Sequence, residues 1–245
     1  SLGRPAHPNI DEVLDAFLAN QRERISVKTF SDYESVVQLL RSYLNGYGYQ
    51  GLSKEEGRFF DRSFNATGKD HREFCQLFGP EKIVENVDGV LGDFMIRKVM
   101  AGESFKRTSG TVSKKLSKWL GDKGYVSENE AEEGASRGLR AGRALVEAER
   151  AARLLQDAAD RLRIDVQAVE DENYVDFDHF TISKVEPGRI WLEVSDQDGK
   201  PRPRGPIPAP KTATRLLRKG WDVSCTLVRL GRTWYMVEVA NVYPT

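Results

Sequence analysis

The chain has 245 residues, of which 39% are apolar and 30% charged, a mixture that can supply two compact cores. Its 37 basic and 37 acidic side chains cancel, which excludes a global attraction to nucleic acid and leaves only local charge patches to consider. No run of about 18 apolar residues could span a bilayer, and residues 1–10 lack a secretory signal pattern. We therefore expect a cytoplasmic protein with no membrane partner.

The first helices are predicted by caps and apolar spacing. Asn9 followed by Glu12 is the pattern of a reciprocal N-terminal cap, and the apolar residues after it recur at helical spacing to about Arg24. Thr29 is the expected cap of a second helix, which runs until glycines at 46 and 48 stop it. An antiparallel helix pair is the simplest outcome.

Further helices are expected along the next 80 residues. Shorter ones are predicted over 54–64 and 71–77, and a longer one runs from Gly79-Pro80 through Met95. Another begins near Phe105 and places apolar residues on one side and lysines on the other. The first two thirds of the chain are thus predicted to be all-α.

Two segments of this helical part match a known pattern. The first is Ile25-Ser26-Val27-Lys28-Thr29 followed by Tyr33, Leu40 and Leu44, and the second is Thr111-Val112 with Leu116, Trp119, Leu120 and Gly124-Tyr125. In these segments residues 9–127 resemble the SAM-like, DNA-clamping N-terminal domain of phage integrases, the tyrosine recombinases. The resemblance implies DNA binding, with Lys114, Lys115 and Lys118 as the contacts.

The chain departs from that family in two respects. The segment from Gly51 to Lys82 is longer than a simple four-helix layout needs. No His-x-x-Arg occurs, and the last third leaves no room for the family's catalytic domain. Local charge around the predicted contacts is high, because eight basic residues lie between Arg97 and Lys123 against Glu103 and Asp122. An ordinary solvated helix face would show the same lysines.

A proline-free stretch from Ser127 to Ile164 predicts one long helix of about 55 Å at about 1.5 Å per residue. Its apolar stripe has heptad spacing, which keeps one seam facing a partner. We call this the heptad seam; it consists of Leu145, Ala148, Ala152, Leu155, Ala159 and Leu162. A homodimer through the heptad seam is one hypothesis, and packing of the seam on the protein's own helical domain is the other.

The last third predicts strands. Apolar residues alternate with polar ones around the Pro187-Gly188 turn, where Ile190, Leu192 and Val194 alternate with Arg189, Trp191 and Glu193. A proline-rich strand over 205–208 is expected at a sheet edge, because proline cannot donate a ladder hydrogen bond. A short helix over 211–219 and strands over 223–229 and 233–242 follow. Five strands with a helix between the third and fourth predict a small barrel, either OB-like or SH3-like.

The charge of this third suggests a ligand. Seven basic residues and no acidic one lie between Lys200 and Lys219, with tryptophans nearby in sequence. A positive groove with aromatic platforms is how small barrels hold single-stranded nucleic acid. The candidate nucleic-acid-binding residues of this part are Arg202, Arg204, Arg215, Arg218, Lys219, Trp221 and Trp234. The competing interpretation places the tryptophans in the core of the barrel.

Catalytic and metal motifs do not emerge from the sequence. His71 and Cys75 are one helical turn apart, but no third ligand is in register with them. Glycine-rich nucleotide loops are missing as well. We therefore expect no catalytic residues, no metal and no cofactor, although carboxylate chemistry is a third, weaker hypothesis.

These patterns combine into an α+β protein with four parts. We expect a helical domain over 9–127, a long coiled-coil helix over 128–164, an acidic linker over 165–176 and a small β-barrel over 177–245. The leading functional hypothesis is a non-enzymatic protein that associates with nucleic acid. The alternative is a protein-interaction scaffold that uses the heptad seam or the barrel.

Overall fold

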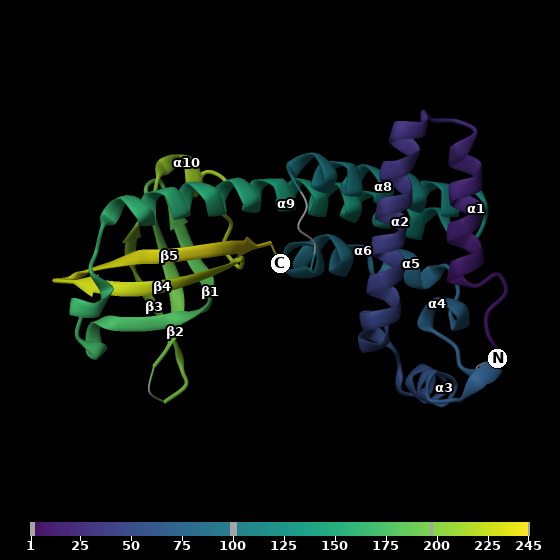
Figure 1. Ribbon diagram of the computed structural model, residues 1–245, viewed down its shortest axis with the longest axis horizontal. Coiled ribbons are helices and arrows are strands. Elements are labelled where there is room, and N and C mark those ends of the chain that lie inside the picture. Colours follow the sequence, from purple (N-terminus) through teal and green to yellow (C-terminus); the bar gives the residue numbers. More distant parts are fainter. Residues whose placement is uncertain (1–2, 99–101, 197, 245) are drawn as a thin grey trace. The chain divides into compact units, whose positions relative to one another are not determined.

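The computed structural model describes residues 3–98, 102–196 and 198–244. Two compact units divide the chain, residues 1–142 and 143–245 (Figure 1). The first unit is helical and the second contains a five-stranded antiparallel sheet, which confirms the α+β class. Helix α9 (Glu128–Leu162) contributes its first part to one unit and its second part to the other. The long helix is therefore shared between the units and does not form a separate segment.

The first unit begins with the helices α1 (Ile10–Arg22) and α2 (Val27–Tyr47). The predicted cap of α1 is present, since the amide of Glu12 donates to Asn9 Oδ1 at 3.0 Å and the amide of Asn9 donates to Glu12 Oε2 at 2.9 Å. The predicted cap of α2 is wrong by three residues. Ser26 is the cap residue, and its hydroxyl oxygen accepts the amide hydrogen of Thr29 at 3.3 Å.

The predicted helix from Gly79 through Met95 is broken in the structure. Its pieces are α5 (Glu81–Glu85), α6 (Val87–Gly89), a π-helical turn η3 (Val90–Phe94) and α7 (Met95–Lys98). Gly92 has a non-helical ψ of −120°, and a Cβ on Gly89 would lie 2.0 Å from the Tyr43 hydroxyl oxygen. Packing against α2 therefore overrides the helical spacing of the apolar residues.

The remaining elements of this unit follow the predicted spacing more closely. Helices α3 and α8 lie close to where the sequence predicted them, while α4 covers only the end of the predicted range. Their bounds are η1 (Gly48–Gly51), α3 (Lys54–Phe64), η2 (Gly68–Asp70), α4 (Phe74–Leu77) and α8 (Glu103–Asp122).

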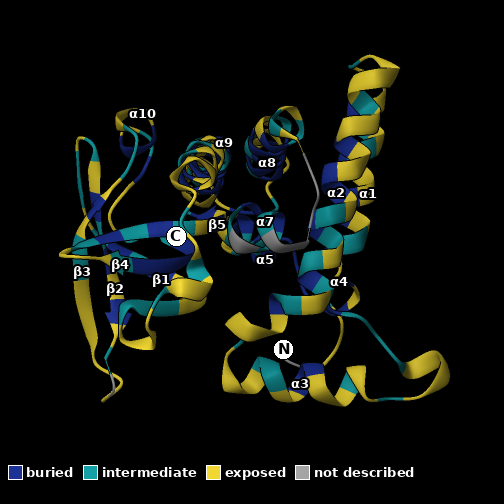
Figure 2. Ribbon diagram, turned by 60° about the vertical axis from the view of Figure 1, so that its left-hand side comes forward, coloured by how far each residue is buried: buried dark blue, intermediate teal, exposed yellow. Residues whose placement is uncertain are grey.

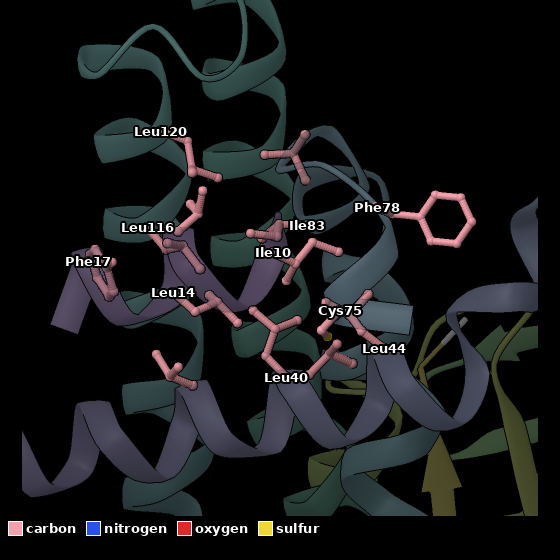
Figure 3. Close-up of a cluster of buried hydrophobic side chains, with 14 of the residues drawn as sticks. Ile10, Leu14, Phe17, Leu40, Leu44, Cys75, Phe78, Ile83, Leu116 and Leu120 are labelled. Carbon is pink, nitrogen blue, oxygen red and sulfur yellow. The ribbon is translucent and has the colours of Figure 1, made fainter. Parts of the chain in front are cut away.

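The core of the helical unit lies where α1, α2 and α8 meet. Leu14 and Phe17 of α1 and Leu116 and Leu120 of α8 are 0–1% exposed, and Leu44 of α2 joins them (Figure 3). Burying an aliphatic side chain of this size contributes about 1.5–3 kcal/mol. Helices α1, α2 and α8 therefore share one hydrophobic core.

Helix α8 packs closely on the first part of α9 because small residues face each other along both helices. A Cβ on Gly142 would lie 2.8 Å from the Cα of Gly110, so the two backbones touch there. The same close approach recurs at Ser113 with Gly138, Ser117 with Gly134 and Gly121 with Ala131. Glycine lowers helix stability by about 1 kcal/mol relative to alanine. At these positions the loss of helix propensity is offset by the closer packing of the two helices.

We expect Gly142→Ala to destabilise the protein by about 1–3 kcal/mol, because the added methyl group forces the helices apart. Gly46→Ala is the matched control, since Gly46 lies inside α2 with open space around it and the substitution should stabilise by about 0.5–1 kcal/mol. Chemical denaturation measures both. Equal stabilisation by the two substitutions would contradict the close packing of α8 and α9.

The second unit orders its strands β3-β2-β1-β4-β5, all antiparallel. Strand β1 begins at Tyr174, inside the segment predicted as an acidic linker, and two short turns precede it. The bounds are η4 (Val166–Ala168), η5 (Asp171–Asn173), β1 (Tyr174–Glu186), β2 (Arg189–Ser195), β3 (Pro201–Pro208), α10 (Lys211–Thr214), β4 (Asp222–Leu230) and β5 (Thr233–Tyr243). The predicted turn at Pro187-Gly188 is present, and a turn at Gly231 joins β4 to β5. Gln197, between β2 and β3, lies outside the described residues.

Strand β3 is an edge strand, as its prolines predicted. It pairs with β2 through Arg202, Arg204 and Ile207, which can donate amide hydrogens to the ladder. The prolines at 201, 203, 206 and 208 have no amide hydrogen to donate, and those at 201, 203 and 208 lie opposite β2 residues in the register. Strands β3 and β5 come into contact at the two ends of the sheet order, yet the sheet stays open because no ladder joins them in the described residues.

The heptad seam is buried against the protein's own sheet. Five of its six residues are buried, and four of them, Ala148, Ala152, Leu155 and Ala159, belong to the same apolar cluster as the inward side chains of the strands. Figure 2 shows the buried stretches of α9 and of the strands in dark blue. Only Leu162, at the end of α9, is exposed. The surface expected to join two copies, or to pack on the helical domain, instead covers the β unit.

Candidate nucleic-acid interface

The basic residues of 200–219 do not form one groove. Arg202 lies at the start of β3, and its Nε donates to Asp196 Oδ2 at 2.6 Å. Arg215 and Lys219 are exposed beyond the opposite end of β3, around α10, and neither forms an ion pair with a described residue. A strand of eight residues spans about 25 Å at about 3.3 Å per residue, so the run of like charges is divided between two ends of the sheet.

Arg218 already has structural partners. Its guanidinium donates to the carbonyl oxygens of Arg215, Leu216 and Leu217 at 2.9–3.0 Å and to Glu147 Oε2 of α9 at 3.0 Å. These bonds close the turn after α10 and hold it against α9. Arg218 therefore has little capacity left for a phosphate.

The two tryptophans chosen from the sequence are core residues. Trp221 is 6% exposed and Trp234 is 8% exposed, and both belong to the apolar cluster of the β unit. The guanidinium carbons of Arg204 and Arg229 lie 5.4 and 5.7 Å from the Trp234 ring centroid. Because both rings are buried in the core, neither can act as a stacking platform in this conformation.

Trp191 differs from the other two tryptophans in its burial and in the face of the sheet on which it lies. It is only partly buried, and it lies on the face of β2 opposite the buried Ile190 and Leu192. The ring rests on β3, where a Cβ on Gly205 would come within 2.5 Å of it. Glycine is needed there, because any side chain would displace the indole.

Cations surround Trp191. Lys184 Nζ lies 4.6 Å and the Arg189 guanidinium carbon 5.6 Å from its ring centroid. Lys211 packs on the turn between β1 and β2, since its Cγ lies 3.6 Å from where a Cβ of Gly188 would be, one residue before Arg189. The carboxylate of Glu186 pairs with two of these cations, and hydrogen bonds from Lys184 and then Arg189 hold the pKa of that carboxyl below the usual range. We call these five residues, Lys184, Glu186, Arg189, Trp191 and Lys211, the Trp191 surface.

The three lysines of α8 do not gather into a basic patch of this kind. Lys115 is exposed, and its Nζ lies 5.5 Å from the Tyr33 ring centroid. Lys114 is partly buried. Lys118 lines a groove of about 470 Å³ whose other charged residues are Asp122, Glu128 and Glu132, so carboxylates outnumber the ammonium group there. That groove repels phosphate.

No group of three potential metal ligands and no helix able to cross a membrane occurs in the part of the chain that the structure describes. Comparison of the chain with protein-family models, curated proteins and solved structures gave no match.

The sequence did contain a signal for Trp191. The alternation around Ile190, Leu192 and Val194 places Trp191 on the opposite face of the strand from the aliphatic residues. Trp221 and Trp234 lacked such a signal, and proximity in sequence to the basic run did not put their rings on the surface.

We expect Trp221→Ala to destabilise the protein by about 3–5 kcal/mol, as for a core tryptophan, and Trp191→Ala to cost about 1 kcal/mol. Thermal or denaturant unfolding of the two variants measures the difference. A loss at Trp191 as large as that at Trp221 would mean that Trp191 serves the core and would remove it as a candidate platform.

Proposed function

We propose that this protein binds single-stranded nucleic acid through the Trp191 surface and does so without catalysing a reaction. The observation that carries the proposal is a partly exposed indole with two cations over its ring, next to a turn on which a third cation, Lys211, packs. Every nucleobase has a π-face that can stack on an aromatic side chain, and the phosphates on either side of a stacked base need cations nearby. Trp191 supplies the first requirement, and Lys184, Arg189 and Lys211 supply the second.

The strand order supports the proposal. β1 pairs with both β2 and β4, a helix lies between β3 and β4, and the end strands β3 and β5 touch. This order is that of an OB-like barrel that is partly open, a fold that holds oligonucleotides on strands 2 and 3 and on its β1–β2 and β4–β5 loops. Trp191 is on β2, above Gly205 of β3, and Arg189 follows the β1–β2 turn. In an OB-like fold, the Trp191 surface would occupy the part best suited to a nucleic-acid strand.

The charge of the site limits its affinity. Three cations less one carboxylate neutralise about two phosphates, and single strands lose about 0.7 in log affinity per tenfold rise in salt for each phosphate contact. Stacking contributes a part that salt does not weaken. We therefore propose a binder of modest, sequence-tolerant affinity whose binding falls gradually with salt.

The helical unit supplies a second, weaker candidate for nucleic-acid binding. Its resemblance to integrase DNA-clamping domains remains a prediction, and of the three lysines that the resemblance implies, Lys115 is the one whose surroundings suit a phosphate best. The burial of the heptad seam weakens the protein-interaction hypothesis, because the seam was one of the two surfaces expected to bind a partner. In the protein-interaction hypothesis, the remaining candidate surface is that of the β unit, which would bind a polypeptide in place of nucleic acid.

Trp191→Ala should weaken binding of a labelled oligothymidylate by about 1–3 kcal/mol, roughly five- to a hundred-fold, because a stacked base loses its platform. Trp191→Phe should retain most of the affinity, since an aromatic face remains. Fluorescence anisotropy at about 50 and 200 mM salt measures these affinities.

Phe177→Ala is the matched control for this series. Phe177 is also an exposed aromatic residue of the β unit, 43% exposed on β1, but acidic residues at 176 and 178 flank it in sequence. Its removal should leave binding unchanged. Equal losses from Trp191→Ala and Phe177→Ala, or binding insensitive to both Trp191 variants, would refute the assignment of the site.

A further inference from the structure

Glu186 lies between the two cations that stand over Trp191. Its Oε1 accepts a hydrogen bond from Lys184 Nζ at 2.7 Å, and its Oε2 accepts from Nε and Nη2 of Arg189, each at 2.6 Å. The two oxygens of one carboxylate thus engage two separate cations. Short, charge-assisted bonds of this kind are also those that a phosphate group would make with lysine and arginine.

We propose that Glu186 is an internal competitor for phosphate at the Trp191 surface, an inference that rests on the proposed function. Its carboxylate occupies the position where two oxygens of a nucleic-acid phosphate would sit. A strand whose base stacks on Trp191 must therefore displace Glu186 from Lys184 and Arg189. Glu186 sets the affinity and the salt dependence of the site.

The exposure of these side chains makes the displacement feasible. Lys184 and Arg189 are 57% and 55% exposed, while Glu186 is 28% exposed. Ion pairs in contact with water are screened and contribute little, so they can exchange partners without disturbing the fold. Because those hydrogen bonds keep the carboxyl pKa low, Glu186 stays ionised at neutral pH and continues to compete.

If Glu186 assisted binding instead of competing with it, its removal would change the affinity in the opposite direction. If Glu186 served mainly to position Lys184 and Arg189 over the ring, its loss would let both side chains disperse and would weaken binding. If it competes, its loss frees two cations for phosphate and strengthens binding. The sign of the change therefore separates the two roles.

The test is E186Q, which keeps the shape of the side chain and removes its charge, with E193Q as the matched control. Glu193 is exposed two residues beyond Trp191 on the same face of β2, and it forms no ion pair with a described residue. Both substitutions change the net charge of the protein equally. Binding of the labelled oligothymidylate is measured by fluorescence anisotropy at about 50 and 200 mM salt, and thermal unfolding verifies that each variant is folded.

E186Q should bind roughly three- to five-fold more tightly than the wild-type protein at the lower salt, and its salt slope should steepen by about 0.7, the value for one added phosphate contact. E193Q should change the affinity much less. Weaker binding by E186Q, or an equal gain from E193Q, overturns the competitor role while leaving the proposed function intact. Absence of binding by both the wild-type protein and E186Q would instead refute the proposed function itself.

Discussion

The spacing of proline in β3 constrains the whole β unit. Four prolines in a strand of eight residues lack the amide hydrogen that a further strand would need as a donor. Strands β3 and β5 come into contact, yet no ladder joins them within the described residues. The same strand carries Gly205 in the middle of this pattern, and the missing side chain leaves the place where Trp191 rests.

Side chains connect β3 and β5, which no hydrogen-bond ladder joins in the described residues. The guanidinium of Arg204, on β3, lies over the ring of Trp234, on β5, and thereby connects the two end strands. The ring of Trp234 is itself buried in the apolar cluster of the β unit. The second part of α9 completes the enclosure, because Ala148 and Leu155 pack in the same apolar cluster as the strands.

Local patterns in the sequence predicted much of the fold. The cap at Asn9, the bounds of α3, the turn at Pro187-Gly188 and the edge position of β3 all follow from interactions between neighbours in the chain, and all are present. The failures involve residues far apart. The break at Gly92 accompanies close packing on α2, and the heptad seam shows only that a narrow apolar stripe exists, not which surface covers it.

The candidate site was predicted only in part, for the same reason. A run of like charges in the sequence does not reveal that Arg218 is engaged by Glu147, which is 71 residues away, or that Arg202 is held by Asp196. Conversely, Lys184 lies outside the basic run and reaches Trp191 through the register of β1 on β2, while Arg189 lies two residues before Trp191 on β2 itself. Strand alternation could place the indole and Arg189 on the outer face, but only the pairing of β1 with β2 shows that Lys184 joins them.

A chain with zero net charge can still present a local binding surface, because the field near a surface depends on the arrangement of a few groups within a Debye length of about 8–10 Å. At the Trp191 surface that arrangement includes its own opposing charge. Under the proposed function, Lys184 and Arg189 without Glu186 would attract any polyanion, whereas with Glu186 in place an anion would gain little unless it also stacked on the indole. Selectivity for a ligand that has both a phosphate and an aromatic base would follow from this balance, because the carboxylate would reduce the purely electrostatic part of binding and leave the stacking part unchanged.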